Sequence, residues 1–247
     1  ANNSTATVRL VPFSGSRAIT VHIGTLTLSN YFNANNRNIT SSQNIQLLPG
    51  RSYTITLKFE LGIQLAASDI TLTQNGCTAN DKNNLAKLRW ATGNLKSTGS
   101  ANYVWTTATD YGYYYTFYST YTGNTDTNNT DPCSKLNTAY YGTGWRTPSR
   151  STLIMLSRCT NKALVNKGMW FMNSSTGLFL PAAGYRNDNR GGSGTEATTS
   201  LGTQGFYQSR DDAGGTVSYF MLFGNGSIDI GAFQKKDGKT VRCVKGD

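Results

Sequence analysis

The sequence predicts a mainly β protein with a small α+β part. Short runs in the first 75 residues alternate polar and apolar side chains at the strand period. Only one segment, residues 148–160, combines apolar side chains at helical spacing with a helix-start signal. Hydrophobic residues make up 37% of the 247-residue chain and charged residues only 15%. Low charge with abundant Thr, Asn and Gly is typical of extracellular β proteins.

The strand-like runs come first along the chain. Residues 4–13 alternate through Ala6, Val8 and Leu10, and residues 17–29 alternate for longer, with a shift at Gly24. Residues 44–61 hold two strands around the turn dipeptide Pro49-Gly50, and residues 68–74 add a fifth strand. This pattern predicts an antiparallel sandwich with one buried face per sheet.

A polar, turn-rich stretch at residues 75–84 separates two parts of the chain that differ in composition. We therefore predict domains at 1–76 and 77–247. All four Trp residues follow this stretch. Residues 85–95 predict a strand, and residues 110–121 an aromatic strand pair. The helix in 148–160 has Ser149 as its N-cap or, alternatively, Thr147 with Pro148 at the first position. Further strands are expected around Trp170 and in four later runs: 178–180, 206–209, 219–223 and 240–244.

The net charge of +10 is spread along the chain without a nucleic-acid-binding motif, so we predict no nucleic-acid partner. No run of 18 apolar residues predicts a transmembrane segment. The start of the sequence lacks the basic and apolar regions of a signal peptide. We expect the targeting segment of a secreted protein to have been removed.

Three groups of residues, in this order, resemble one family. They are "LRWATGNL" (88–95), "DPC" with "GWRTPS" (131–149), and "LFLPAAGYR", "GFYQSR" and "VRCVK" (178–245). Together they resemble the Fibrobacter-succinogenes-major-paralogous domain family over roughly residues 80–247. The resemblance implies a C-type-lectin-like fold of the kind found on secreted and surface proteins, many at the ends of Bacteroidetes fimbriae. One departure is Tyr207-Gln208-Ser209, where the family commonly has Tyr-Trp-Ser.

The N-terminal string "IQLLPGRSYTITLKF" (45–59) is similar to the transthyretin-like β-sandwich of fimbrillin-type pilins. The resemblance implies that this domain accepts a donor strand from a neighbouring pilin subunit at a sheet edge. Donor strands in such pilins come from the C-terminus, and here the sequence ends four residues after Cys243. We therefore expect a tip subunit, exposed at the cell surface on a fimbrium or the outer membrane.

The chain has four cysteines, at positions 77, 133, 159 and 243. None of them forms a CxxC pair, which disfavours a zinc site. Their even number and wide spacing predict two disulfides, and the residues alone allow three pairings. The family resemblance implies the pair Cys133–Cys243 and, with it, the pair Cys77–Cys159.

The sequence predicts no catalysis, no cofactor and no metal. The single histidine, His22, is out of phase with Val21 and Ile23 and is expected to face solvent. The adjacent acids Asp211 and Asp212 point apart on a strand or loop, which does not suit paired-carboxylate chemistry. Formylglycine-generating enzymes share the lectin-like fold, but their reactive Cys pair or copper site has no counterpart. The calcium ligand strings of lectins are also absent, and Arg186 and Arg190 flank residues 187–189 and repel a cation.

The polar, glycine-tipped segment 207–219 is the predicted ligand-binding face; the alternative is an ordinary surface hairpin. Its candidate contacts are Tyr207, Gln208, Ser209, Arg210, Asp211, Asp212 and Tyr219. In the aromatic run we expect Tyr111, Tyr113 and Tyr115 to face one way and Tyr114 the other, with one set in the core. In "LPAAGYRNDN" (180–189), we expect close backbone packing at 182–184 and a turn locked by Tyr185 and Arg186.

These features together predict a non-catalytic adhesin at the tip of a fimbria. Its lectin-like domain would bind a glycan or a host or bacterial surface protein. The alternative is a secreted or lipid-anchored glycan-binding protein that is not part of a pilus.

Overall fold

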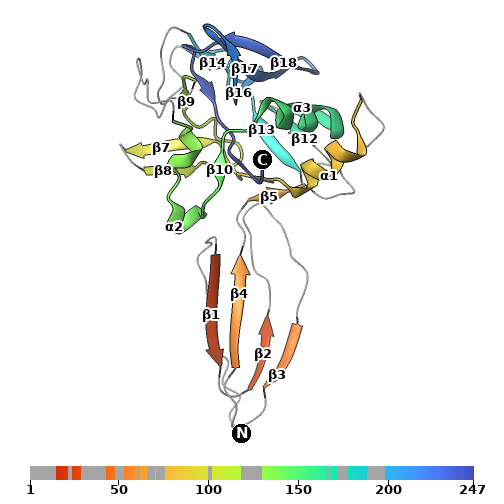
Figure 1. The fold of residues 1–247 in the computed structure, drawn as a ribbon, viewed down its shortest axis with the longest axis vertical. Coiled ribbons are helices and arrows are strands. Elements are labelled where there is room, and N and C mark those ends of the chain that lie inside the picture. Colours follow the sequence, from red (N-terminus) through yellow and green to blue (C-terminus); the bar gives the residue numbers. More distant parts are fainter. Residues whose placement is uncertain are drawn as a thin grey trace. The chain divides into compact units, whose positions relative to one another are not determined.

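The computed structural model describes much of the chain after residue 61 and four strands before it. The described residues are 15–21, 24–28, 43–47, 53–59, 62–65, 70, 76–99, 102–117, 130–165, 167–171, 177–187 and 198–247. His22, the run 4–13 and residues 188–190 lie outside them. The protein is mainly β, as predicted. It divides into two compact units, one formed by residues 1–61 with 139–141 and the other by 62–138 with 142–247 (Figure 1).

The first unit contains two antiparallel strand pairs. Strand β1 (Gly15–Val21) pairs with β4 (Tyr53–Phe59), and β2 (Gly24–Leu28) pairs with β3 (Gln43–Leu47). These strands confirm the alternating runs on either side of Gly24 and of Pro49-Gly50. Of the predicted fifth strand, only Ile70 is described, and it forms an isolated bridge with Thr160.

The second unit begins earlier than the sequence predicts. Strand β5 (Ile63–Gln64) pairs with β6 (Arg89–Trp90), so the units divide before Gly62 rather than after residue 76. The same sheet has the order β10-β20-β6-β5 and brings distant parts of the chain together. Its other two strands are β10 (Trp145–Arg146) and β20 (Val244–Lys245).

A five-stranded sheet, in the order β18-β17-β16-β19-β9, carries the predicted binding face. Its strands are β16 (Gln204–Gly214), β17 (Val217–Gly224), β18 (Ser227–Gln234), β19 (Lys239–Thr240) and β9 (Tyr114–Tyr115). Strands β16 and β17 confirm two predicted runs. Strand β18 was not predicted, although Ile228 and Ile230 stand at strand spacing and both are half-buried.

Smaller sheets complete the second unit. A three-stranded antiparallel sheet contains β11 (Lys162–Val165), β12 (Gly168–Phe171) and β13 (Leu178–Pro181). Two strand pairs accompany it. They are β7 (Leu95–Gly99) with β8 (Asn102–Trp105), and β14 (Tyr185–Arg186) with β15 (Thr198–Thr199).

Helix α3 (Arg150–Cys159) confirms the predicted helix and settles its N-cap. The Ser149 hydroxyl accepts a hydrogen bond from the Thr152 N–H, while Leu153, Leu156 and Cys159 form the buried face. The described residues before it include two short helical turns, the 3₁₀ helix η2 (Pro132–Lys135) and α2 (Thr138–Tyr141).

Helix α1 (Ala79–Lys87) corrects the interpretation of 75–84 as a turn and of 85–95 as one strand. Only Leu85 of this helix is buried, so a periodic apolar stripe is missing. Its start is instead marked by a capping box, in which Thr78 and Asp81 exchange hydrogen bonds between side chain and backbone. This pair was the available signal in the sequence.

The aromatic run also departs from the predicted alternation. Tyr114 and Tyr115 are both buried, whereas Tyr111 and Tyr113 are half-buried. The reason is that both faces of β9 are covered: the Tyr114 hydroxyl donates to the Ala183 carbonyl, and the Tyr115 ring lies 6.3 Å from that of Tyr103. Residues 118–129 lie outside the described part.

Two disulfides, Cys77–Cys159 and Cys133–Cys243, close long loops with sequence separations of 82 and 110, and both predicted pairs are confirmed. Chain-entropy arguments give about 4–5 kcal/mol of stabilisation for loops of this length. The first bridge ties α1 to the end of α3, beside a core that includes Trp90, Phe171 and Phe223. Among the described helices, none is long and apolar enough to cross a membrane.

Candidate ligand-binding site

The first half of the predicted binding face is part of the protein interior. Tyr207, Gln208 and Ser209 are at most 2% exposed, so their side chains cannot meet a ligand at the surface. The Tyr207 hydroxyl donates to the Pro181 carbonyl at 2.9 Å and accepts from Asn94 Nδ2 at 3.2 Å. Burial raises the pKa of the Tyr207 phenol well above its usual range, which keeps it a hydrogen-bond donor. These three residues therefore hold the fold, which corrects their predicted role.

The second half of the face reaches the surface because β16 bulges. Gln208 pairs with Phe220 and Asp212 with Ser218, so three residues of β16 lie opposite Tyr219 alone. In this bulge the Arg210 N–H leaves the sheet and donates to the Pro148 carbonyl at 2.9 Å. Bulges re-aim side chains and are common beside functional sites.

The acids of the bulge hold other parts of the protein in place. Asp211 accepts a hydrogen bond from the Arg150 N–H at 2.6 Å, and the Arg150 guanidinium lies 4.2 Å from the centre of the Tyr219 ring. Asp212 accepts from Lys235 Nζ at 2.8 Å, and this bond holds the pKa of the Asp212 carboxyl below its usual value. Ligand contact by the partly exposed Arg210, Asp211, Asp212 and Tyr219 stays a prediction.

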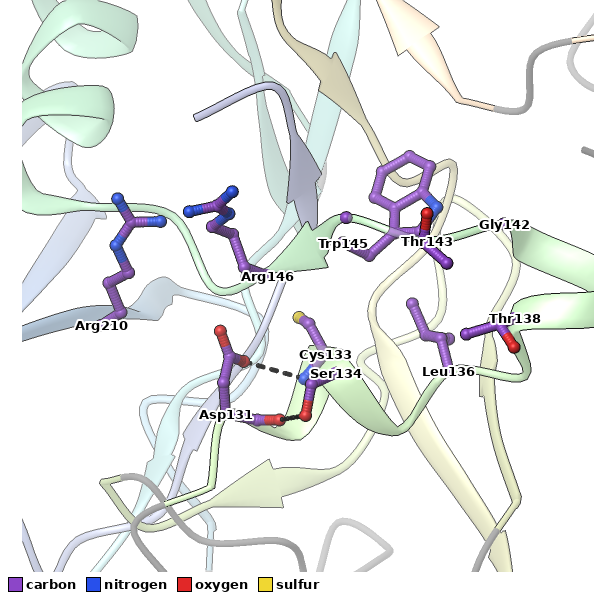
Figure 2. Close-up of a pocket in the computed structure, with 11 residues that line it drawn as sticks. Asp131, Cys133, Ser134, Leu136, Thr138, Gly142, Thr143, Trp145, Arg146 and Arg210 are labelled. Carbon is purple, nitrogen blue, oxygen red and sulfur yellow. Dashed lines mark hydrogen bonds between the residues drawn. The ribbon is translucent and has the colours of Figure 1, made fainter.

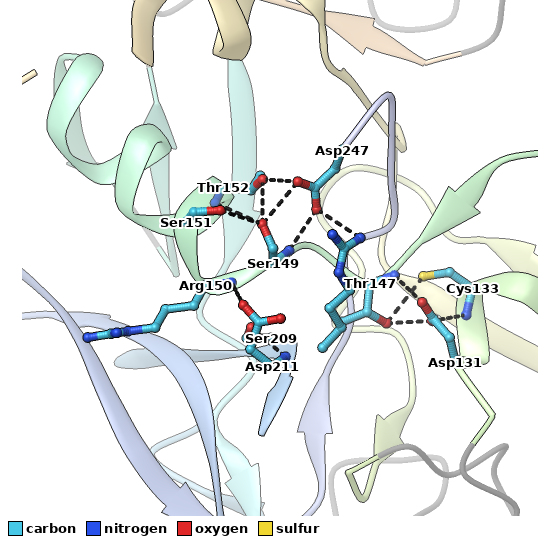
Figure 3. A network of polar contacts seen from close by, with 11 residues as sticks. Asp131, Cys133, Thr147, Ser149, Arg150, Ser151, Thr152, Ser209, Asp211 and Asp247 are labelled. Atoms are coloured by element: carbon cyan, nitrogen blue, oxygen red, sulfur yellow. Dashed lines mark hydrogen bonds and ion pairs between the residues drawn. The ribbon is translucent and has the colours of Figure 1, made fainter. Parts of the chain in front are cut away.

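Arg210 forms an ion pair with the carboxylate of Asp247. Figure 3 shows this carboxylate beside Ser149 and Thr152, at the start of α3. Asp247 accepts hydrogen bonds from the Ser149 N–H at 2.8 Å and the Ser149 hydroxyl at 3.0 Å, and also from the Thr152 hydroxyl. Its Oδ2 forms an ion pair with Arg210 Nη1 at 3.2 Å. The positive end of the α3 dipole also stabilises the negative charge of Asp247.

A pocket of about 510 Å³ lies next to this network, between η2 and β10 (Figure 2). Arg210 is the one residue of the predicted face that lines it. Among the described residues, its lining consists of Asp131, Cys133, Ser134, Leu136, Thr138, Gly142, Thr143, Gly144, Trp145, Arg146 and Arg210. Figure 2 shows Arg146 and Arg210 at one end of the pocket, and Leu136, Thr138 and Thr143 at the other.

Asp131 fixes the wall of the pocket. As the N-cap of η2, its Oδ1 accepts from the Cys133 N–H at 2.9 Å. The Thr147 hydroxyl donates to the same oxygen at 2.7 Å, and the Thr147 N–H donates to Oδ2 at 2.8 Å. These bonds join the string "DPC" to the string "GWRTPS", and the Cys133–Cys243 disulfide anchors the same wall to the last strands.

Arg146 supplies the exposed charge of the pocket. Its side chain makes no hydrogen bond or ion pair within the part of the chain that the structure describes. Its neighbour Trp145 is buried and packs edge-on against Trp105, with ring centroids 4.6 Å apart. Arg146 could not be recognised as a pocket residue from the sequence, because the Trp-Arg pair alone does not reveal which side chain is exposed.

A second polar cluster is completely buried and structural. Arg242 donates from Nε to Asn94 Oδ1 at 2.8 Å and from its two Nη atoms to the carbonyls of Ala91 and Phe179, both at 3.0 Å. Burial lowers the pKa of Arg242 to about 10. The strings "LRWATGNL", "LFLPAAGYR" and "VRCVK" therefore meet at one network in the interior.

The described part of the segment 180–189, residues 180–187, forms a packed turn beside this network, as its sequence predicts. Ala182 and Ala183 are fully buried, and Gly184 adopts a φ of 62° while its N–H donates to the Gln204 carbonyl. The turn is fixed by Arg186, which exchanges backbone hydrogen bonds with Gly238.

The chemistry of the pocket is that of recognition by charge and hydrogen bonds. Guanidinium groups donate, a carboxylate accepts, and exposed hydroxyls at Thr138 and Thr143 do both. Among the described residues, no group of three or more His, Cys, Asp or Glu side chains is placed to hold a metal ion. Searches against protein-family models, curated proteins and solved structures find no match to this chain.

Proposed function

We propose that this protein is a non-catalytic, cell-surface adhesin that binds a glycan or a surface protein through its second unit. In this proposal the second unit is a C-type-lectin-like domain, and the first is a transthyretin-like sandwich of a fimbrial tip subunit. The observation that carries the proposal is the open pocket, into which the β16 bulge places Arg210. The ordered strings at 88–245 support the fold on which the proposal depends.

The disulfides support the location. Both bridges connect segments far apart in sequence, and such bridges persist in oxidising compartments. The net charge of +10 also attracts anionic cell surfaces.

The first unit supports the role in a fimbria. Its described strands form two antiparallel pairs, β1 with β4 and β2 with β3, and an added strand needs a sheet edge of this kind. A peptide that copies the C-terminal strand of a stalk pilin should form a complex with the full chain and raise its melting temperature. Neither effect would be seen with a scrambled peptide. Adhesion without strand addition would instead favour a secreted or lipid-anchored glycan-binding protein.

The adhesion itself is tested on an array of glycans and host and bacterial surface proteins, with the full chain as the probe. Arg210→Ala should lose binding of any ligand found, because it removes a pocket side chain. Arg158→Ala is the matched control, since Arg158 is an exposed residue in the last turn of α3 and does not line the pocket. Equal binding by both variants would overturn this choice of site.

A further inference from the structure

The pocket has an unequal charge balance. Asp247 compensates Arg210. In the part of the chain that the structure describes, Asp131 is held by three hydrogen-bond donors and by no cation. Arg146 has no such partner among the described residues. Lys245 adds another positive charge nearby, because its side chain packs against the lining residue Gly144, whose Cβ position would be 3.7 Å from Lys245 Cε. The three cations Arg146, Arg210 and Lys245 outnumber the two carboxylates Asp131 and Asp247 by one. One net positive charge is therefore left for a ligand.

The hydrogen-bonding groups restrict the ligand further. Within the described residues, Asp131 Oδ2 accepts one hydrogen bond, from the Thr147 N–H, and so retains an acceptor site. The hydroxyls of Thr138 and Thr143 are exposed and line the same pocket. A ligand that fits must offer hydroxyl donors to a carboxylate as well as an anionic acceptor to a guanidinium.

The geometry of the pocket suits a small ligand bound without much rearrangement. Its volume falls in the range of about 300–1,000 Å³ that is usual for small-molecule sites. The Asp131–Thr147 bonds, the Cys133–Cys243 bridge and the Trp105–Trp145 packing hold its walls. A site ordered before binding loses less conformational entropy on complex formation.

We infer that the pocket binds a carboxylated sugar residue, of the hexuronate type, at the end of a glycan. Its carboxylate pairs with the Arg146 guanidinium, which suits planar, bidentate recognition. Its hydroxyls donate to Asp131 and exchange hydrogen bonds with the two threonines. A more highly charged phosphate group matches less well, because Asp131 repels it and only one net positive charge is present. The inference rests on the proposed function and names its ligand class.

The test uses the full chain and a glucuronate-terminated oligosaccharide, measured by isothermal titration calorimetry. Three chemically matched probes accompany it: the methyl ester, the glucose-terminated analogue and a sulfated analogue. We expect the acid to bind at least about tenfold more tightly than the ester, the scale of one charge-assisted hydrogen-bond pair. Equal affinity for acid and ester, or tighter binding of the sulfated probe, would overturn the inference.

Variants locate the site. Arg146→Ala should remove the preference for the acid over the ester, and Thr143→Val should weaken both probes alike. Arg158→Ala should leave all affinities unchanged. Retention of the acid preference in Arg146→Ala, with a wild-type melting temperature, would place the carboxylate elsewhere and overturn the assignment. If the array finds a neutral glycan or a protein ligand while the acid shows no preference, the adhesin proposal stands and this inference fails.

Discussion

The carboxylate of Asp247 accepts a hydrogen bond from the backbone N–H of Ser149, with 2.8 Å between Oδ2 and N. The same oxygen pairs with Arg210. One side chain therefore completes the cap of α3 and fixes the direction of a pocket arginine. If the pocket binds its ligand as proposed, this carboxylate couples the stability of α3 to ligand binding.

Asp247→Ala should lower both the stability of the protein and its affinity for a pocket ligand. It removes a capping anion and leaves Arg210 without its ion pair, and we expect a loss of about 1–3 kcal/mol in the free energy of unfolding. Urea denaturation measures this loss. Asp229→Ala is the control because Asp229 is exposed on β18, and it should change stability by less than about 0.5 kcal/mol. Equal effects of the two variants would contradict the linkage.

Arg242→Met tests the buried network. The change keeps much of the side-chain volume but leaves Asn94 Oδ1 and the carbonyls of Ala91 and Phe179 without their donor. Buried acceptors that lose a charged donor are costly, so we expect a loss of at least about 3 kcal/mol in urea unfolding. Arg158→Met, at an exposed site, should be close to neutral. A stable Arg242→Met variant would show that the network is dispensable.

The strings that form this network could be singled out in the sequence by their resemblance to a family. Their meeting in one buried hydrogen-bond network could not be predicted. The strings around Asn94, Tyr207 and Arg242 stand far apart in sequence, and alternation or spacing does not show that they converge. Tyr207 and Arg210 illustrate the limit within one strand. Both are polar residues of the same run, yet the bulge between Gln208 and Asp212 separates an interior side chain from a pocket side chain.

Local signals were more informative. Ser149 marked the start of α3, and alternation located β1 to β4, because these features depend on neighbouring residues only. Helix α1 was missed because its stability comes from its cap and from Cys77–Cys159 rather than from an apolar stripe. The pocket was missed because its lining comes from segments that only the tertiary fold brings together.

Gly93→Ala should destabilise the protein strongly. A Cβ atom at Gly93 would lie 1.8 Å from the Thr106 carbonyl oxygen, a backbone atom that cannot move aside easily. We expect a loss of about 3 kcal/mol or more, at the upper end of overpacking effects. The control is Gly231→Ala, where the nearest atoms would be 3.4 Å from the Cβ. Thermal unfolding should separate the two variants, and similar melting temperatures would contradict the close approach.

Lys239 should make the protein more stable as the pH rises above about 8. Its ammonium group is fully buried and donates to the carbonyls of Gln234 and Asp237, at 2.7 and 3.2 Å. Burial lowers the pKa of Lys239 to about 8, against a partly compensating effect of the Asp237 charge. Between pH 8 and about 10.4, the usual lysine pKa, the unfolded chain binds more protons than the folded one. The free energy of unfolding therefore increases with pH in this window and not below it.

The size of this effect follows from the shift in pKa. A difference of roughly two units corresponds to about 3 kcal/mol, spread across the window from pH 8 to about 10.4. Lys239→Met lacks the titrating group, while the tyrosines and other lysines remain. Urea unfolding of both proteins from pH 7 to 10.5 gives the contribution of Lys239 as their difference. That difference should be flat below pH 8 and should then move in favour of the wild type. Parallel curves over the whole range would mean that Lys239 titrates normally in the folded protein.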